Sequence, residues 1–214
     1  MSENKSYKII AIIAILVGAI GVAVGYSAFA SNLKITSSAE VTPDANLFSV
    51  VFSSSDQSVQ TNNITPTLNK TVTGFSATNA TINNSGAMPT ISNLKATFTE
   101  PGQSATYSFY AYNAGEYIAH LKKIEFDGSK TCTAKENTTQ SLVTSACNGI
   151  SLSVKVGDET ATTSTVNNIT SHSLATSTAE TVIVTITYAD GSAMADGDFD
   201  VTFPDIKLDY ESVD

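Results

Sequence analysis

The amino-acid sequence predicts an all-β protein: an antiparallel β-sandwich or jelly roll of about 9–10 strands, preceded by an apolar N-terminal helix. Segments of alternating apolar and polar residues recur along the chain at spacings of about 8–15 residues, and turn residues separate them. Only 14% of the 214 residues are charged, against about 25% in an average soluble protein. Thr, Ser and Asn take their place. After the N-terminal segment, no stretch has a convincing amphipathic helix pattern.

Residues 1–30 have the features of a secretory signal peptide. A polar, weakly basic start precedes an uncharged apolar run, which ends in the small-x-small sequence Ala28-Phe29-Ala30. Cleavage after Ala30 would leave Ser31 as the first mature residue, and cleavage after Ala28 is a second option. The alternative is a retained membrane anchor, because about 20 apolar residues suffice to span a bilayer. Under both interpretations the rest of the chain is extracellular or on the cell surface, and signal peptidase is a partner during export.

Residues 31–45 form a predicted N-terminal strand and hinge, followed by a β-sandwich domain over residues 46–214. The strand places Leu33, Ile35, Ala39 and Val41 on one apolar face. Such a strand can be the first strand of its own sandwich, or it can add to an open sheet edge of a neighbouring subunit. Repeated head to tail, the second arrangement does not close and makes a filament.

The alternating segments predict the strands of the sandwich domain, with a loop over residues 62–66. A hairpin is expected from Leu94 to Asn113, with its turn at Pro101-Gly102 and with Ala105, Tyr107, Phe109 and Ala111 on one face of the return strand. Val182–Tyr188 is the most apolar strand and is expected at the centre of a sheet. Pro204 marks a sheet edge or a bulge. The remaining expected strands are Leu47–Ser53, Val72–Ile82, Tyr117–Phe126, Ile150–Val156 and Phe199–Tyr210.

Cys132 and Cys147 are the only cysteines in the sequence. In an oxidising compartment they would most simply pair with each other, closing a loop of about 15 residues for about 3 kcal/mol of stability in the chain-entropy model. The alternative is two separate buried thiols.

Charge and motifs exclude several functional classes. The net charge of −9 and the pI near 4.6 argue against nucleic-acid partners, which require clustered basic residues. No His-Glu-x-x-His, Gly-x-Ser-x-Gly or phosphate-binding glycine loop occurs in the chain, so we do not expect an enzyme. A lone histidine such as His120 is more often structural than a general base.

One acidic cluster is a weak calcium candidate. Asp196, Asp198 and Asp200 stand at alternate positions around Gly197, and calcium prefers oxygen-rich loops of this kind. The spacing and terminal Glu of an EF-hand are absent, so the alternative is a hairpin turn kept soluble by its charges. No other cofactor or metal is expected.

Two stretches resemble the TasA and camelysin family of secreted biofilm-matrix proteins of bacteria. The first is Gly25-Tyr26-Ser27-Ala28-Phe29-Ala30, which runs into the strand Leu33–Val41. The second is Glu100-Pro101-Gly102-Gln103-Ser104, followed by Phe109 and by Asn113-Ala114-Gly115. The resemblance implies a jelly-roll subunit of an extracellular fibre, in which the mature N-terminal strand leaves its own subunit and completes the next. The chain departs from the family in its cysteine pair, and it lacks the zinc-peptidase motif that a protease activity would need.

These observations lead to a hypothesis of a non-enzymatic, secreted structural protein that associates with itself into surface or matrix fibres by N-terminal strand exchange. The alternative is a membrane-anchored cell-surface adhesin or binding module that acts as a monomer. In that case the protein would contact the membrane only through the uncleaved N-terminal segment.

Overall fold

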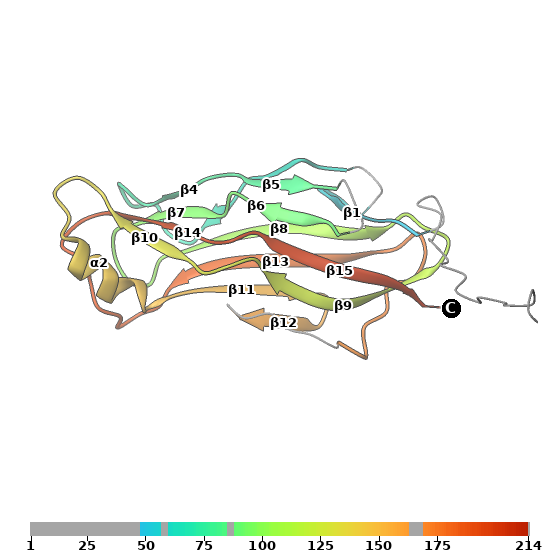
Figure 1. Cartoon of the computed structure of the whole chain (residues 1–214). Coiled ribbons are helices and arrows are strands. Elements are labelled where there is room, and N and C mark those ends of the chain that lie inside the picture. Colours follow the sequence, from blue (N-terminus) through green and yellow to red (C-terminus); the bar gives the residue numbers. More distant parts are fainter. Residues whose placement is uncertain (1–47, 57–59, 85–87, 163–168, 214) are drawn as a thin grey trace, which may run out of the picture. The chain divides into compact units, whose positions relative to one another are not determined.

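Two layers of antiparallel strands form the protein in the computed structural model, which describes residues 48–56, 60–84, 88–162 and 169–213. Figure 1 shows the layers, one on the other, with a short helix beside β10 at one end. The prediction of an all-β antiparallel sandwich is confirmed.

The first layer is a six-stranded sheet in which β13 lies between β8 and β11. Its central place agrees with the prediction from the apolar run Val182–Tyr188. In sheet order the strands are β1 (Val50–Ser53), β8 (Ser104–Asn113), β13 (Ala179–Tyr188), β11 (Ile150–Val156) and β12 (Glu159–Thr162), with β3 (Thr67–Leu68) also paired to β8.

The second layer consists of two short sheets, and most strands of one sheet continue along the chain into a strand of the other. The first sheet has the order β2 (Asn63–Ile64), β5 (Ala80–Asn83), β6 (Thr90–Ser92), β15 (Ile206–Val213) and β9 (Ile118–Phe126). The second has the order β4 (Ser76–Ala77), β7 (Lys95–Phe98), β14 (Phe199–Thr202) and β10 (Thr131–Ala134). Because β5 follows β4, β7 follows β6, β10 follows β9 and β15 follows β14 in the chain, the layer is one sheet with a break in each long strand.

The breaks lie side by side and remain hydrogen-bonded to one another. The Phe203 amide donates to the Leu94 carbonyl and the Asp127 amide to the Asp205 carbonyl, both at 2.9 Å. Pro204 stands in one of these breaks, between β14 and β15. The sequence left an edge strand or a bulge as the options for Pro204. The structure instead has a break there, with Pro204 outside both strands, and the register shift in β15 lies between Asp209 and Tyr210.

The core between the layers follows the predicted alternation. Ala105, Tyr107, Phe109 and Ala111 of β8 are buried, as predicted, and none is more than 1% exposed. Phe98 is the centre of an aromatic group, with its ring centroid 5.6 Å from that of Phe75, 5.7 Å from Tyr188 and 6.3 Å from Phe199.

The predicted hairpin from Leu94 to Asn113 is wrong, although its strands and turn are present. β7 pairs with β14 and β4, whereas β8 pairs with β13, β1 and β3. The turn at Pro101-Gly102 therefore carries the chain from one layer to the other. Alternation determines which face of a strand is buried but not which strand lies beside it, so both pairings satisfied the pattern.

Further segments differ from the prediction in detail. The expected strand Val72–Ile82 is shorter and divided into β4 and β5, and the expected loop over residues 62–66 contains the two-residue strand β2. Divided strands of this kind raise the number of separate strand segments above the expected 9–10.

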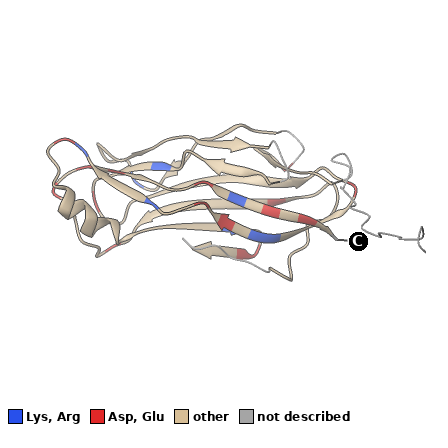
Figure 2. Ribbon diagram, in the orientation of Figure 1, with Lys and Arg blue, Asp and Glu red and all other residues tan. Residues whose placement is uncertain are grey.

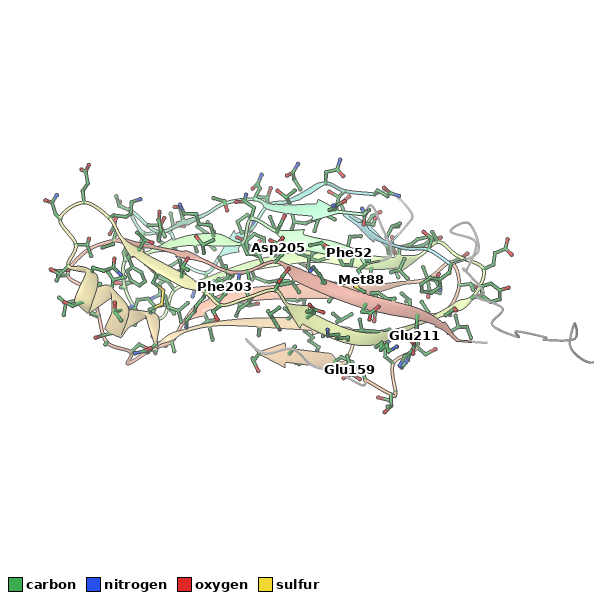
Figure 3. All side chains as sticks on the ribbon, in the orientation of Figure 1. Phe52, Met88, Glu159, Phe203, Asp205 and Glu211 are labelled. Carbon is green, nitrogen blue, oxygen red and sulfur yellow. A yellow bond between two sulfur atoms is a disulfide. The ribbon has the colours of Figure 1, made fainter. Side chains whose placement is uncertain are left out.

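The segment between the cysteines contains a helix, α2 (Gln140–Cys147), which the sequence analysis did not predict. Val143 and Ala146 are its buried residues. The predicted disulfide is confirmed: Cys132 in β10 is bonded to Cys147 at the end of α2, with 6.1 Å between the Cα atoms (Figure 3). The eight residues include Ser and Thr, which are weak helix formers, so the tertiary contacts of α2 stabilise it more than its composition does.

Candidate functional site

The N-terminal candidates lie outside the described residues. These are the cleavage-site residues Ala28, Ala30 and Ser31, and the strand face Leu33, Ile35, Ala39 and Val41. Within residues 48–213, apart from the gaps given above, no helix combines the length and the apolar character needed to cross a bilayer. The structure therefore bears on function through the edges, the ends and the buried polar groups of the sandwich.

The motif residues at both ends of β8 are buried polar side chains that organise turns. The Gln103 carboxamide oxygen accepts from the amides of Thr99 at 2.9 Å and Glu100 at 3.3 Å, and its nitrogen donates to the Thr99 hydroxyl at 2.6 Å. At the other end, Asn113 donates to the carbonyls of Tyr117 at 2.8 Å and Leu174 at 3.0 Å. Gln103 and Asn113 are fully buried, so here the motif that carries the family resemblance performs a structural role.

Gly102 is required in the same turn. Its φ is +81°, a conformation that residues with a Cβ rarely adopt. An added Cβ would also collide with the carboxylate of Asp190.

Side-chain amides form hydrogen bonds with backbone amides and carbonyls at two sheet edges. The Asn84 side chain accepts from the Phe52 amide at 2.6 Å and donates to the Phe52 carbonyl at 3.1 Å. The Gln140 side chain accepts from the Ala134 amide at 2.8 Å and donates to the Cys132 carbonyl at 3.1 Å. Each amide thus occupies the position of one peptide group of an adjacent strand on β1 or β10, which reduces the backbone available for edge-to-edge association.

The outer edge of β9 is covered by the segment Ile169–Leu174. The amides of Ala119 and Leu174 donate to each other's carbonyls at 2.9 and 2.7 Å, and the Ile169 amide donates to the Lys122 carbonyl at 3.1 Å. This contact places two histidines close together, with ring centroids of His120 and His172 6.2 Å apart. The sequence analysis found no relation between them because 52 positions separate them in the chain.

A buried cluster of His172, Glu180 and Tyr210 connects the two layers. The His172 Nδ1 accepts from the Leu121 amide at 2.9 Å, so the ring proton is on Nε2, which donates to Glu180 at 2.7 Å. The Tyr210 hydroxyl donates to the same carboxylate at 2.9 Å. The side chains of His172 and Glu180 are only 5% and 13% exposed. Burial, followed by the charge of Glu180 and the hydrogen bond to it, raises the pKa of Tyr210 well above its ordinary value.

The ring nitrogens of His120 and His172 are all occupied by contacts within the protein. His120 contacts the carbonyls of Ile169, at 2.6 Å, and His172. A general base needs a free nitrogen within hydrogen-bond reach of a substrate. These contacts instead suit a structural role, in which the cluster holds the Ile169–Leu174 segment, β9, β13 and β15 together.

The three acidic candidates have different partners. Asp196 accepts from the Thr139 hydroxyl at 2.6 Å and the Thr139 amide at 2.8 Å, and these hydrogen bonds lower its pKa. Thr139 is the N-cap residue of α2, so Asp196 holds the start of the helix from a distant loop.

Asp200 lies in β14 and accepts from the Thr97 hydroxyl at 2.6 Å and from Lys95 at 2.9 Å. Burial raises its pKa, but the bonds from Thr97 and Lys95 and the charge of Lys135 outweigh burial, so the net shift is downward. The third residue, Asp198, approaches Gly74, where an added Cβ would lie 2.7 Å from a carboxylate oxygen. Among the described residues there is no group of three His, Cys, Asp or Glu side chains that could hold a metal ion.

Charged side chains gather on β9 and β15 (Figure 2). Lys207 pairs with Asp127 at 2.8 Å and Lys122 with Glu211 at 2.9 Å. Both are pairs of opposite sign, so this face has no basic patch of the kind that binds a phosphate backbone.

No protein-family model, curated protein or solved structure matches this chain.

Proposed function

We propose that the protein is a secreted, non-enzymatic subunit of an extracellular surface or biofilm-matrix fibre of a bacterium, assembled by exchange of the N-terminal strand Leu33–Val41. In this proposal residues 1–30 are a signal peptide, and the protein's main partner is a second copy of itself. The jelly-roll connectivity and the family membership implied by the sequence resemblance are parts of the same proposal.

The observation that carries the proposal is the position at which the sandwich unit begins. By its internal contacts the chain divides between Thr42 and Pro43, and the compact unit is Pro43–Asp214. The described core extends from Val50 to Tyr210. A strand with one apolar face that precedes such a unit needs a surface on which to bury that face. A neighbouring copy provides one.

The protected edges give further support. Three edge strands have backbone groups that are hydrogen-bonded within the protein. The partners are Asn84 on β1, Gln140 on β10 and the Ile169–Leu174 segment on β9. Edges covered in this way disfavour indiscriminate sheet association. Self-association would then depend on a dedicated strand such as Leu33–Val41.

Electron microscopy of a chain that begins at Ser31 tests the proposal. Negative staining should show filaments for the wild-type sequence and none for Ile35→Asp, which puts a charge on the apolar face. Thr36→Asp is the matched control, because it places the same charge on the opposite face of the same strand and should leave the filaments intact. Far-UV circular dichroism should show a folded β-protein for all three, so that a loss of filaments from Ile35→Asp reports on assembly and not on unfolding. Filaments from Ile35→Asp would refute the strand-exchange mechanism.

The alternative is a membrane-anchored adhesin or binding module that acts as a monomer. It is supported by the length of the uncharged N-terminal run, which is sufficient to span a bilayer. Monodisperse particles from all three proteins, together with an uncleaved N-terminus in the native host, would favour this alternative.

A further inference from the structure

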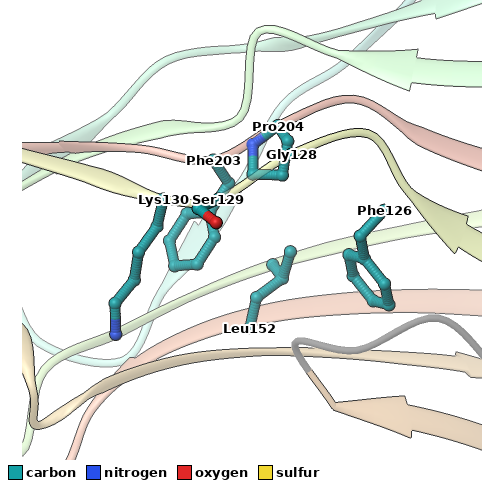
Figure 4. Close-up of a pocket in the computed structure, with 7 residues that line it drawn as sticks. All are labelled: Phe126, Gly128, Ser129, Lys130, Leu152, Phe203 and Pro204. Carbon is teal, nitrogen blue, oxygen red and sulfur yellow. The ribbon is translucent and has the colours of Figure 1, made fainter.

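A pocket opens where the breaks in two long strands of the second layer lie side by side. Its volume is about 240 Å³, and Phe126, Leu152, Phe203 and Pro204 make its apolar walls. The connection from β9 to β10 contributes the rest, Gly128, Ser129 and Lys130 (Figure 4). The pocket exists because the backbone leaves the regular sheet at both connections while Leu152 of β11 continues the first layer beneath it.

The volume suits a small ligand. An apolar protein cavity of about 150 Å³ is known to hold a benzene molecule, whereas drug-sized ligands need pockets of about 300–1,000 Å³. A pocket of about 240 Å³ therefore has room for one ring or a branched aliphatic group, together with a small polar group.

Lys130 is the one charged residue among those that line the pocket. Its side chain is half-buried, and its ammonium donates to the carbonyl of Ile150. It forms no ion pair among the described residues. Every other lysine among the described residues pairs with a carboxylate, except the exposed Lys155. An ammonium has three donors, so two remain after the bond to Ile150.

Desolvation of Lys130 also favours an anionic partner. Burial lowers the pKa of its ammonium, since no carboxylate offsets the loss of water. Charge-assisted hydrogen bonds to a carboxylate are about twice as strong as neutral ones. An anion bound beside the ammonium would compensate for the desolvation.

We infer that this pocket binds a small monocarboxylic acid with a single-ring or branched apolar body, its carboxylate on the Lys130 ammonium and its apolar part among Phe126, Leu152 and Phe203. The inference does not depend on the proposed fibre function, because neither the N-terminal strand nor the covered edges contribute to the pocket.

Isothermal titration calorimetry of the full-length protein with phenylacetate tests the inference. Phenylacetamide is the matched neutral probe, because it keeps the ring and loses the charge. We expect phenylacetate to bind at least about tenfold more tightly than phenylacetamide, and Lys130→Gln to remove this preference. Lys155→Gln removes a lysine of β11, the strand of Leu152, that has no ion pair among the described residues, and it should bind phenylacetate as the wild type does.

The comparison of acid with amide uses the wild-type protein, so it stands even if Lys130→Gln disturbs the contact with Ile150. Backbone amide shifts in NMR spectra should move at Ser129 and Leu152 when phenylacetate is added. Equal affinity for acid and amide, equal weakening by the two lysine variants, or no binding of phenylacetate at millimolar concentration would each overturn the inference.

Discussion

Replacing Tyr210 by Phe removes one hydroxyl from the cluster that connects the two layers. Tyr210 is 4% exposed, and its hydroxyl donates to a Glu180 oxygen at 2.9 Å. A hydrogen bond to a charged group contributes about 1.5–3 kcal/mol, and the substitution leaves no cavity because the ring remains. We therefore expect the free energy of unfolding to fall by about 1.5–3 kcal/mol, which for a protein of this size lowers the melting temperature by roughly 3–12 °C.

Two other tyrosines serve as controls in the same urea-unfolding assay. The Tyr107 hydroxyl donates to the neutral carbonyl of Thr78 at 2.9 Å, so Tyr107→Phe should cost only about 0.5–1.5 kcal/mol. The Tyr110 hydroxyl has no hydrogen-bond partner among the described residues, so Tyr110→Phe should leave stability nearly unchanged. If Tyr210→Phe costs no more than Tyr107→Phe, the reasoning about a charged acceptor is wrong.

The same variant should change the response to alkali. Because the pKa of Tyr210 is raised in the folded protein, its contribution to stability is complete below the ordinary tyrosine pKa of about 10 and is lost as pH rises above that value. Tyr210→Phe should therefore lose less stability above pH ~10 than the wild type does. Tyr107, whose pKa burial raises to about 12, contributes in the same direction.

Three further predictions concern the disulfide, one edge and one carboxylate. Reducing Cys132–Cys147 should lower the free energy of unfolding by about 3 kcal/mol; an unchanged denaturation midpoint in dithiothreitol would contradict this. Gln140→Ala should cost about 1 kcal/mol because it exposes the edge of β10, while Ser141→Ala, the control at the next position, should be neutral in the same unfolding assay. The folded pKa of Asp200 is lowered, so its stabilisation is present above pH ~4 and lost as pH falls below it. Asp200→Asn should flatten the acid side of the stability profile measured by circular dichroism, and an unchanged profile would count against the hydrogen bonds described for Asp200.

Local pattern was sufficient for the strand faces and the disulfide. The side chains of Tyr107 and Phe109 point into the core as predicted, because a pleated strand alternates its side chains whatever lies beside it. Cys132 and Cys147 form the predicted pair, since two cysteines allow only one intramolecular bond. At Pro204 the pattern predicted an irregularity, an edge or a bulge, and the structure has a break between β14 and β15 there.

Contacts between residues distant in sequence could be learned only from the tertiary structure. The turn at Gly102 joins two layers instead of two paired strands, because alternation carries no information about the neighbouring strand. Helix α2 has weak intrinsic propensity, and its N-cap residue Thr139 is held by Asp196, which is 57 positions away in the chain.

The polar cluster and the pocket arise in the same way. His172, Glu180 and Tyr210 share no periodic pattern. The packing of the layers brings Tyr210 of β15 to Glu180 of β13, and the docking of the Ile169–Leu174 segment against β9 adds His172. The sequence pattern indicated only ordinary strand positions for Phe126, Leu152 and Phe203. They line a pocket because the break between β9 and β10 lies beside the break between β14 and β15. In this protein the sequence by itself determined what the regularly alternating strands β8, β11 and β13 bury. The packing of the two layers decided which polar groups meet, because hydrogen bonds and cavities depend on distances that local periodicity does not specify.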